Sequence, residues 1–193
     1  MKELQTRLPG VRLFELQAFS DERGFFLETY RAEWAAMLGV AEFIQDNHSR
    51  SRRGTVRGLH YQIGEGQAKL VRVVRGSIFD VVVDLRRTSP TYCQWEAFDL
   101  DDVSHRTLYI PVGFAHGFSV LSIVADVAYK VSRPYDPGAE RTLVWNDGRV
   151  GVEWPERDPL LSPRDAAAPT LTEIEPELDA WAGDGEPGYL PAR

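Results

Sequence analysis

The chain has 193 residues, a length typical of one compact domain, and a formal net charge of −7 from 22 Lys and Arg against 29 Asp and Glu. This charge gives no overall attraction toward nucleic acid or an anionic membrane, so any phosphate must be bound by a local group of cations. Cys93 is the single cysteine, which excludes an internal disulfide and fits a reducing compartment.

The N-terminal residues carry charges with no apolar run behind them, and nowhere do about 18 consecutive apolar residues occur. We therefore expect neither a signal peptide nor a membrane-spanning helix. The expected location of the protein is the cytoplasm.

Short runs rich in Val, Ile, Phe and Tyr, separated by Gly, Pro, Asp or Ser, are typical of strands in an all-β barrel or sandwich. A helix is expected over 31–38, where Trp34, Met37 and Leu38 form one apolar stripe. From Pro155 onward the composition shifts to Pro, Asp, Glu, Ala and Gly, so we expect loops with short helices there. In chain order, strands are expected over residues 11–16, 24–30, 43–48, 55–61, 69–74, 77–85, 95–100, 106–110, 115–120 and 125–131.

The clearest of these strands, 69–74 and 77–85, flank the dipeptide Arg75-Gly76. A glycine turn between two apolar runs favours a β-hairpin, so we expect these two strands to pair. Alternation with a period of two puts four apolar side chains of the second strand on one face toward the core, namely Phe79, Val81, Val83 and Leu85.

Two histidines are expected to point into the interior from separate strands. Alternation along residues 57–62 puts His60 on the face of Gly58 and Gln62, with Arg57, Leu59 and Tyr61 on the other face. The second histidine, His116, ends a Pro-x-Gly-x-x-His pattern in residues 111–116, the turn and strand entry that many cupin barrels use to aim a histidine inward. Two inward histidines indicate a pocket.

Metal-dependent cupins usually combine the second histidine with an earlier His-x-His and a following Glu. Here the first motif is His60-Tyr61-Gln62, and no two of the four histidines are spaced as neighbouring ligands, so we expect no metal and no other cofactor. A neutral imidazole near pH 7 can instead abstract a proton beside a carbonyl group. Such a base needs an orienting carboxylate, and Asp165 is a candidate because the C-terminal segment can fold back over the barrel mouth.

A series of segments, in order along nearly the whole chain, resembles the dTDP-4-dehydrorhamnose 3,5-epimerase family. The segments are Phe19-x-Asp21-x-Arg23-Gly24-x-Phe26-x-Glu28-x-Tyr30, Gln45-x-Asn47-x-Ser49, Arg57-Gly58-Leu59-His60, Lys69-Leu70-Val71, Ser89-Pro90-Thr91, Pro111-x-Gly113-x-x-His116-Gly117-Phe118, Tyr129-Lys130, Trp145-Asn146-Asp147, Trp154-Pro155 and Leu161-Ser162-x-x-Asp165.

This resemblance implies a single cupin-like jelly-roll domain over residues 1–193, with strands and a helix in 1–50, the barrel core in 51–150, and loops with short helices in 151–193. It implies epimerisation of dTDP-4-dehydro-6-deoxy-D-glucose at carbons 3 and 5, without a metal.

The resemblance also implies roles for single residues. His60 is the general base, Asp165 orients it, Tyr129 donates the proton on the opposite face of the sugar, and Lys69 stabilises the enolate. The nucleotide-binding residues that it implies are Arg23, Glu28, Gln45, Asp46, Asn47, Arg57, His116, Tyr135, Glu140 and Arg164, with Tyr135 stacking on thymine. Arginine suits this work because its planar fork binds phosphate oxygens bidentately.

In the family, the strand from Arg23 to Glu28 is exchanged between subunits, so the resemblance implies a homodimer with sites built across the interface. Two positions depart from the family pattern. Arg133-Pro134-Tyr135 replaces a segment that commonly carries two adjacent aromatic residues, and Arg164 stands where a Lys is common.

Two other functions remain open at this point. A 3-epimerase of the same family would invert one carbon only and would use the same acid and base residues. A non-catalytic cupin would bind a sugar nucleotide without turning it over, although the joint presence of His60, Lys69, Tyr129 and Asp165 argues against it.

Overall fold

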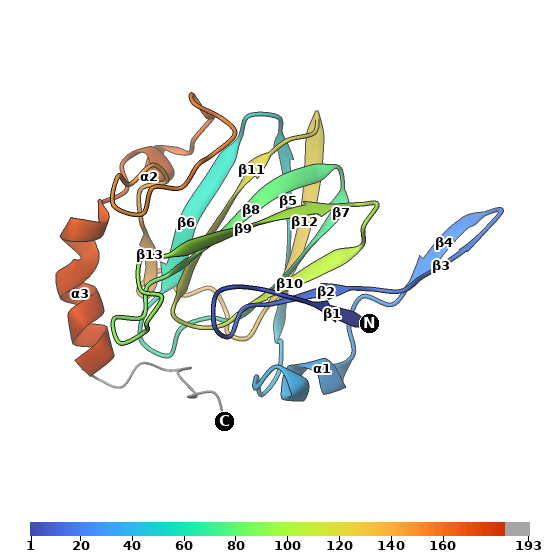
Figure 1. Cartoon of the computed structure of the whole chain (residues 1–193), viewed down its shortest axis with the longest axis horizontal. Helices are drawn as coiled ribbons and strands as arrows, with labels where there is room; N and C mark the ends of the chain where they lie inside the picture. Colours follow the sequence, from blue (N-terminus) through green and yellow to red (C-terminus); the bar gives the residue numbers. More distant parts are fainter. Residues whose placement is uncertain (184–193) are drawn as a thin grey trace.

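The computed structural model describes residues 1–183 and shows two packed β-sheets with a projecting hairpin and three helices among these residues (Figure 1). The helices are α1 (Ala32–Met37), α2 (Pro163–Ala166) and α3 (Leu171–Gly183). The strands are β1 (Lys2–Leu4), β2 (Arg12–Glu15), β3 (Ala18–Asp21), β4 (Gly24–Leu27), β5 (Gln45–Arg52), β6 (Val56–Gln62), β7 (Lys69–Arg75), β8 (Ser77–Asp84), β9 (Trp95–Asp101), β10 (Arg106–Ile110), β11 (Phe114–Val120), β12 (Val124–Val131) and β13 (Glu140–Thr142).

One sheet has the order β1-β2-β10-β7-β12-β5 and the other has the order β13-β6-β11-β8-β9, with antiparallel pairing throughout both. The apolar faces of the two sheets meet in a core that includes Val71, Ile78, Val82 and Leu108. The predicted all-β, cupin-like sandwich is confirmed, although the two sheets do not close into a barrel.

The predicted hairpin at Arg75-Gly76 is wrong. Strand β7 pairs with β10 and β12, whereas β8 pairs with β9 and β11, so the chain crosses from one sheet to the other at this turn. The crossing requires glycine, because Gly76 has φ 81° and a Cβ there would lie 2.2 Å from the carbonyl oxygen of Val124. A turn signal in the sequence marks the bend but does not say which strands pair.

Strand β8 is buried on both faces. Val81, Val83 and Leu85 share one face as predicted, with Phe79 partly buried beside them. These residues pack on the outer side of the sheet under α3, which presents apolar side chains at a spacing of three to four residues, namely Leu171, Ile174, Leu178 and Trp181.

Strands β1, β3 and β13, which the sequence does not predict, are three or four residues long and mostly polar or exposed. Strands β3 and β4 form a hairpin that extends away from the sandwich (Figure 1), and it leaves Phe19, Phe25 and Phe26 more than half exposed. The helix expected over 31–38 is present as α1. The C-terminal prediction of loops and short helices is met by α2 and α3 up to Gly183, and the remaining ten or so residues lie outside the described part of the chain.

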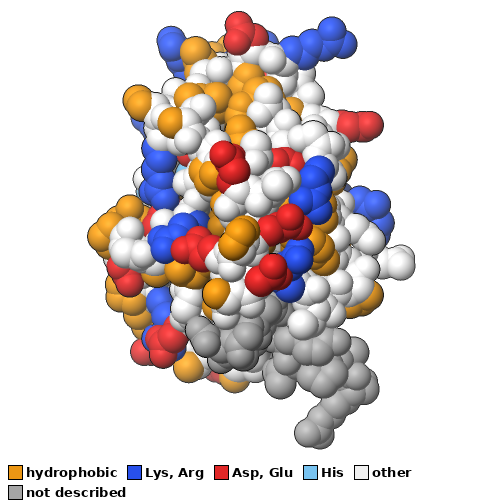
Figure 2. All heavy atoms as spheres, turned by 90° about the vertical axis from the view of Figure 1, so that its left-hand side faces the viewer, with side chains coloured by type: hydrophobic (Ala, Val, Ile, Leu, Met, Phe, Trp, Pro, Cys, Tyr) orange, Lys and Arg blue, Asp and Glu red, His pale blue; other side chains and the backbone are white. Residues whose placement is uncertain are grey.

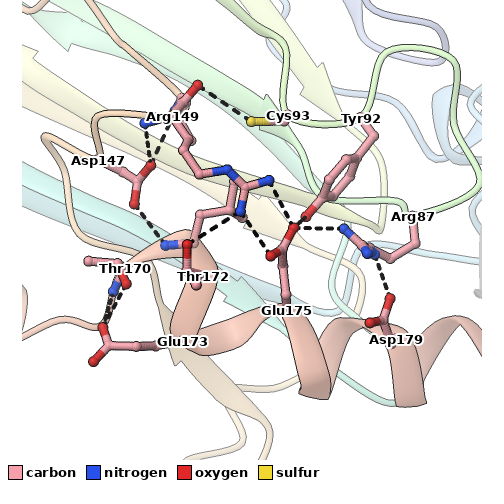
Figure 3. A network of polar contacts seen from close by, with 12 residues as sticks. Arg87, Tyr92, Cys93, Asp147, Arg149, Thr170, Thr172, Glu173, Glu175 and Asp179 are labelled. Carbon is pink, nitrogen blue, oxygen red and sulfur yellow. Dashed lines mark hydrogen bonds and ion pairs between the residues drawn. The ribbon is translucent and has the colours of Figure 1, made fainter.

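A polar network holds α3 against the loops of the five-stranded sheet (Figure 3). The carboxylate of Glu175 accepts hydrogen bonds from Arg87, Tyr92 and Arg149. Asp147 accepts the backbone N–H of Leu171 at 2.8 Å, which satisfies one of the free donors at the start of the helix.

The face that carries α3 shows acidic and basic side chains intermingled, without a large patch of one sign (Figure 2). Within residues 1–183, no helix is long and apolar enough to cross a membrane.

Candidate active site

A cavity of about 230 Å³ lies between the two sheets and takes side chains from both of them. From the six-stranded sheet come residues of β5, β7 and β12, and from the five-stranded sheet come residues of β6, β11 and β13. The lining residues are Gln45, Asn47, Ser49, Arg57, His60, Gln67, Lys69, His116, Gly117, Phe118, Tyr129, Tyr135 and Glu140. The histidines predicted to point inward, His60 and His116, both line it.

His60 on β6 is hydrogen-bonded to Asp165 on α2, with 2.6 Å between Nε2 and Oδ1. The segment before α2 is attached to the start of β6, because Leu160 exchanges backbone hydrogen bonds with Gly54 and Val56. This attachment and the Ser162 cap of α2 bring Asp165 under the histidine. Burial acts to raise the pKa of Asp165, but the hydrogen bond and charge of His60 and the hydrogen bonds of the Ser162 side chain and the Gly58 backbone outweigh it, so the pKa is lowered.

The local backbone of β6 departs from the alternation that the sequence predicts. The register against β11 shifts between the pairs His116–His60 and Phe118–Arg57, so one extra residue is accommodated in β6. As a result Arg57 and His60 line the same cavity, and the prediction that they lie on opposite faces is wrong. Gly58 makes the irregularity possible, because its φ is 115° and a Cβ would lie 2.7 Å from the Cα of Gly117.

Tyr129 on β12 lines the same cavity as His60 from the other sheet. Its side chain is half-buried, and burial, together with the charge of Glu140, raises the pKa of its hydroxyl. Lys69 on β7 is buried, and its Nζ donates to the carbonyl oxygen of His60 at 3.4 Å. Burial lowers the pKa of Lys69, while the charges of Glu140 and Asp80 act in the opposite direction.

His116 on β11 is paired with Asp80 on β8, with its Nε2 3.1 and 2.9 Å from the two carboxylate oxygens. Asp80 is fully buried and was not foreseen from the sequence, although an acidic residue in the apolar run Ile78-Phe79-Asp80-Val81-Val82 is a signal of a buried polar partner. Ser49 and Gln67 also line the cavity without having been predicted.

Of the predicted nucleotide-binding residues, six line the cavity: Gln45, Asn47, Arg57, His116, Tyr135 and Glu140. Gln45 donates to Asn47 at 2.8 Å and accepts from the backbone N–H of Tyr135 at 3.3 Å. Arg164 lies outside the cavity lining, with its guanidinium 3.8 Å from the Glu140 carboxylate.

Three predicted residues lie away from this cavity within the described chain. Arg23 is exposed on the β3–β4 hairpin, where it pairs with Asp21, and Glu28 pairs with Arg31. Asp46 is exposed on the opposite face of β5 and binds Lys130 at 2.7 Å. Its position follows from strand alternation, since Gln45 and Asn47 point into the cavity.

The chemistry that this arrangement allows is acid and base catalysis. An imidazole oriented by a carboxylate and a phenol from the other sheet share one cavity with a buried amine. Among residues 1–183, no group of three or more His, Cys, Asp or Glu side chains is arranged so that it could hold a metal ion.

The family profile described as dTDP-4-dehydrorhamnose 3,5-epimerase matches residues 5–173. The enzyme of that name from Pseudomonas aeruginosa is 51% identical over 178 residues, which are 91% of this chain and 98% of the relative. A longer relative of the same name from Neisseria gonorrhoeae is 47% identical over 177 residues, and the chain spans 54% of its length. A dTDP-4-dehydrorhamnose 3-epimerase from Streptomyces niveus is 46% identical over 169 residues, 86% of this chain and 82% of the relative.

Solved structures agree with these sequence matches. The crystal structure of a dTDP-6-deoxy-D-glucose-3,5-epimerase from Legionella pneumophila, in complex with dTDP-4-keto-L-rhamnose, superimposes with a TM-score of 0.88 at 43% identity, covering 92% of this chain and 96% of that one. An epimerase from Mycobacterium tuberculosis superimposes with a TM-score of 0.86 at 36% identity, covering 95% and 99% of the two chains. This chain therefore belongs to the dTDP-4-dehydrorhamnose 3,5-epimerase family and is an isomerase.

Proposed function

We propose that the protein converts dTDP-4-dehydro-6-deoxy-D-glucose to dTDP-4-dehydro-L-rhamnose by epimerising carbons 3 and 5. The roles of the residues are assigned from one observation: His60, hydrogen-bonded to Asp165, and Tyr129 line one cavity from two different sheets. Carbons 3 and 5 both adjoin the 4-keto group, so the protons on both are acidified by the same carbonyl. Inversion requires a proton to leave one face and another to arrive on the opposite face.

His60 is the proposed base, and the geometry indicates which nitrogen acts. An ionised carboxylate can only accept hydrogen bonds, so Nε2 of His60 carries a hydrogen that it donates to Asp165. The lone pair that takes the substrate proton is therefore on Nδ1. When the ring becomes cationic, the adjacent Asp165 carboxylate stabilises it, which is the role of the carboxylate in other His–Asp pairs.

Tyr129 is the proposed proton donor on the opposite face. Burial and Glu140 raise the pKa of its hydroxyl, which keeps the phenol protonated over the range in which an enzyme of this kind works. The half-buried position of the side chain supports this role, since the phenol must recover its proton from solvent after each turnover.

Lys69 is proposed to stabilise the enolate that forms between the two proton transfers. The negative charge gathers on the oxygen of the 4-keto group, and a buried ammonium acts there more strongly than it would in water. The hydrogen bond from Lys69 to the backbone of His60 supports a position beside the base.

Arg57 and His116 are proposed to bind the diphosphate, and Tyr135 to stack on the thymine. The remaining residues of the proposed nucleotide site are Gln45, Asn47 and Glu140, with Arg164 beside Glu140.

Arg23 and Glu28 are proposed to enter the site of a partner subunit, because the hairpin that leads to them extends away from its own sandwich and exposes its phenylalanines (Figure 1). The protein would then act as a homodimer.

The activity is tested by incubating the purified protein with dTDP-4-dehydro-6-deoxy-D-glucose in deuterium oxide and following the sugar protons by NMR. Loss of the proton signals at carbons 3 and 5, with formation of the L-rhamnose configuration, is the expected result. Exchange at carbon 3 alone would identify a 3-epimerase instead. Binding of the nucleotide sugar without any exchange would identify a non-catalytic binding protein.

The shared site is tested by mixing two inactive variants. His60→Ala lacks the base but supplies an intact hairpin, and Arg23→Ala lacks the hairpin arginine but keeps the base. A heterodimer of the two would contain one complete site, so remixing should restore roughly a quarter of the wild-type sites. If activity stays at the level of the separate variants while heterodimers form, each site is built from one chain.

A further inference from the structure

The most deeply buried ionisable group near the cavity is Asp80, and none of the acid and base roles above uses it. Its carboxylate has no exposed surface and does not line the cavity, because His116 lies between it and the open space. An isolated buried carboxylate costs several kcal/mol, so its presence requires a compensating partner.

The contact between His116 and Asp80 indicates which nitrogen of the neutral imidazole carries the hydrogen. One nitrogen, Nε2, lies 3.1 and 2.9 Å from the two oxygens, so with Asp80 ionised a single Nε2–H is shared between both of them. Burial raises the pKa of Asp80, while the charge and hydrogen bond of His116 and the charge of Lys69 act in the opposite direction. Nδ1 of the neutral ring is then a bare acceptor. A bare acceptor cannot hydrogen-bond an ionised phosphate oxygen, whereas a protonated Nδ1 can donate to it.

The groups around His116 act on the pKa of its ring in opposite directions. Burial lowers its pKa, and so do the charges of Lys69 on β7 and His60 on β6, while Asp80 on β8 acts in the opposite direction. Arg57 on β6, Tyr129 on β12 and Glu140 on β13 line the same cavity. An arriving diphosphate adds negative charge on the side of the ring opposite Asp80, which favours the cationic form.

We propose that His116 takes up a proton when the diphosphate of a nucleotide sugar binds, and that Asp80 is the positioning residue that makes this possible. The imidazolium would lie between two anions, donating Nε2–H to Asp80 and Nδ1–H to a phosphate oxygen. Affinity for the nucleotide sugar is then linked to pH through His116. This inference rests on the proposed function, because it takes His116 to be a diphosphate ligand.

The test is titration calorimetry with dTDP-glucose near pH 7, repeated in buffers that differ in ionisation enthalpy. This ligand lacks the 4-keto group, and its diphosphate is esterified at both ends, so the ligand has no group of its own that titrates near neutral pH. The dependence of the observed heat on the buffer gives the number of protons taken up. The expected result for the wild-type protein is uptake that approaches one proton per site.

Asp80→Asn keeps a hydrogen-bond acceptor for Nε2–H but removes the charge. We expect it to abolish the uptake and to weaken binding about tenfold or more near pH 7, because the ring then lacks the carboxylate that stabilises its cationic form. The matched control is Asp84→Asn, which changes an equally buried aspartate on the same face of β8 that binds Arg86, Ser89 and Thr91 away from the cavity. Its proton uptake should equal that of the wild type.

His116→Gln gives a second route to the answer if Asp80→Asn does not fold. It should bind dTDP-glucose without proton uptake, since the titrating ring is gone. Wild-type binding with no uptake, or undiminished uptake in either Asp80→Asn or His116→Gln, would overturn the inference. The exchange experiment in deuterium oxide stays separate: a wild-type protein that exchanges the sugar protons but shows no uptake retains the proposed function and loses only this linkage.

Discussion

His60 and Asp165 are 105 residues apart in the chain, and 2.6 Å separates the Nε2 of the histidine from Oδ1 of the aspartate. The aspartate reaches this position because the segment before α2 forms backbone hydrogen bonds with the start of β6. The base of the proposed reaction is therefore assembled from the sandwich and from the C-terminal segment that covers it.

Replacing the orienting carboxylate tests this pair. Asp165→Asn keeps the shape of the side chain but removes the charge that stabilises the imidazolium, and its amide can turn an N–H toward the ring and favour the wrong tautomer. We expect kcat to fall by about 10²–10⁴-fold with little change in KM. Asp158→Asn, an exposed aspartate of the same segment, is the control and should retain the wild-type rate. A similar kcat for Asp165→Asn and wild type would remove Asp165 from the mechanism.

Replacing the proposed donor separates the two halves of the reaction. Tyr129→Phe should still release the substrate proton to His60, so deuterium enters the sugar, but inverted product should form at least about 10²-fold more slowly because the opposite face lacks its donor. The measurement is the ratio of exchange to epimerisation by NMR. Tyr109→Phe changes a buried tyrosine of β10 outside the cavity lining and should leave that ratio unchanged. A Tyr129→Phe variant that epimerises normally would disprove the assignment.

The pH dependence of kcat should report on Lys69. Burial lowers its pKa from the ordinary value, so the ammonium loses its proton at a lower pH than an exposed lysine does. The proposed enolate stabilisation requires the charged form, and kcat should therefore decline on the alkaline side at a pH below about 10.4. Lys69→Met should be slow throughout and should lack this decline. An alkaline limb that is unchanged in Lys69→Met would show that another group causes it.

Acid should weaken the attachment of α3. The hydrogen bond from Arg149, aided by that from Tyr92, lowers the pKa of Glu175 to about 2. A lowered pKa in the folded state stabilises the protein above the unfolded-state value of about 4.3, and this contribution is lost as the pH falls toward 2. Urea unfolding between these values should show a smaller loss of stability with acid in Glu175→Gln than in wild type. Glu153→Gln, in an exposed loop, should behave like the wild type.

The start of α3 offers a test that links stability to the site. Asp147 accepts backbone N–H groups from Arg149, Val150 and Leu171, so Asp147→Ala leaves buried donors without a partner. We expect a loss of about 1–3 kcal/mol in the free energy of unfolding. Helix α2, which carries Asp165, directly precedes α3, so loosening α3 should also disturb the His60–Asp165 contact. We therefore expect kcat to fall although His60 itself is unchanged. Unchanged stability would mean that α3 is held by its apolar face alone.

Much of the sandwich could be predicted from the sequence because its strands alternate and are separated by glycine and polar residues. The pairing of strands could not, because Gly76 bends the chain in the same way whether the next strand returns beside the first or enters the other sheet. The shift in β6 was also hidden, since it depends on the close approach of Gly58 to Gly117 on β11, two residues that are 59 positions apart in the sequence.

The residues of the candidate site that belong to family motifs could be predicted from the sequence. Partners that come from a distant strand without a motif could not. The sequence indicated His116, but its partner Asp80 lies on another strand inside an apolar run and has no motif of its own. The resemblance implies that Asp46 binds the nucleotide together with Gln45 and Asn47, whereas alternation along β5 turns Asp46 to the other face.

The proposed mechanism is tested most directly by a crystal structure of the protein with a non-reacting dTDP-sugar such as dTDP-glucose in the cavity. We expect Nδ1 of His60 and the hydroxyl of Tyr129 to lie on opposite faces of the hexose ring, within reach of carbons 3 and 5. A sugar that contacts only one of these two groups, or that has both groups on the same face, would contradict it.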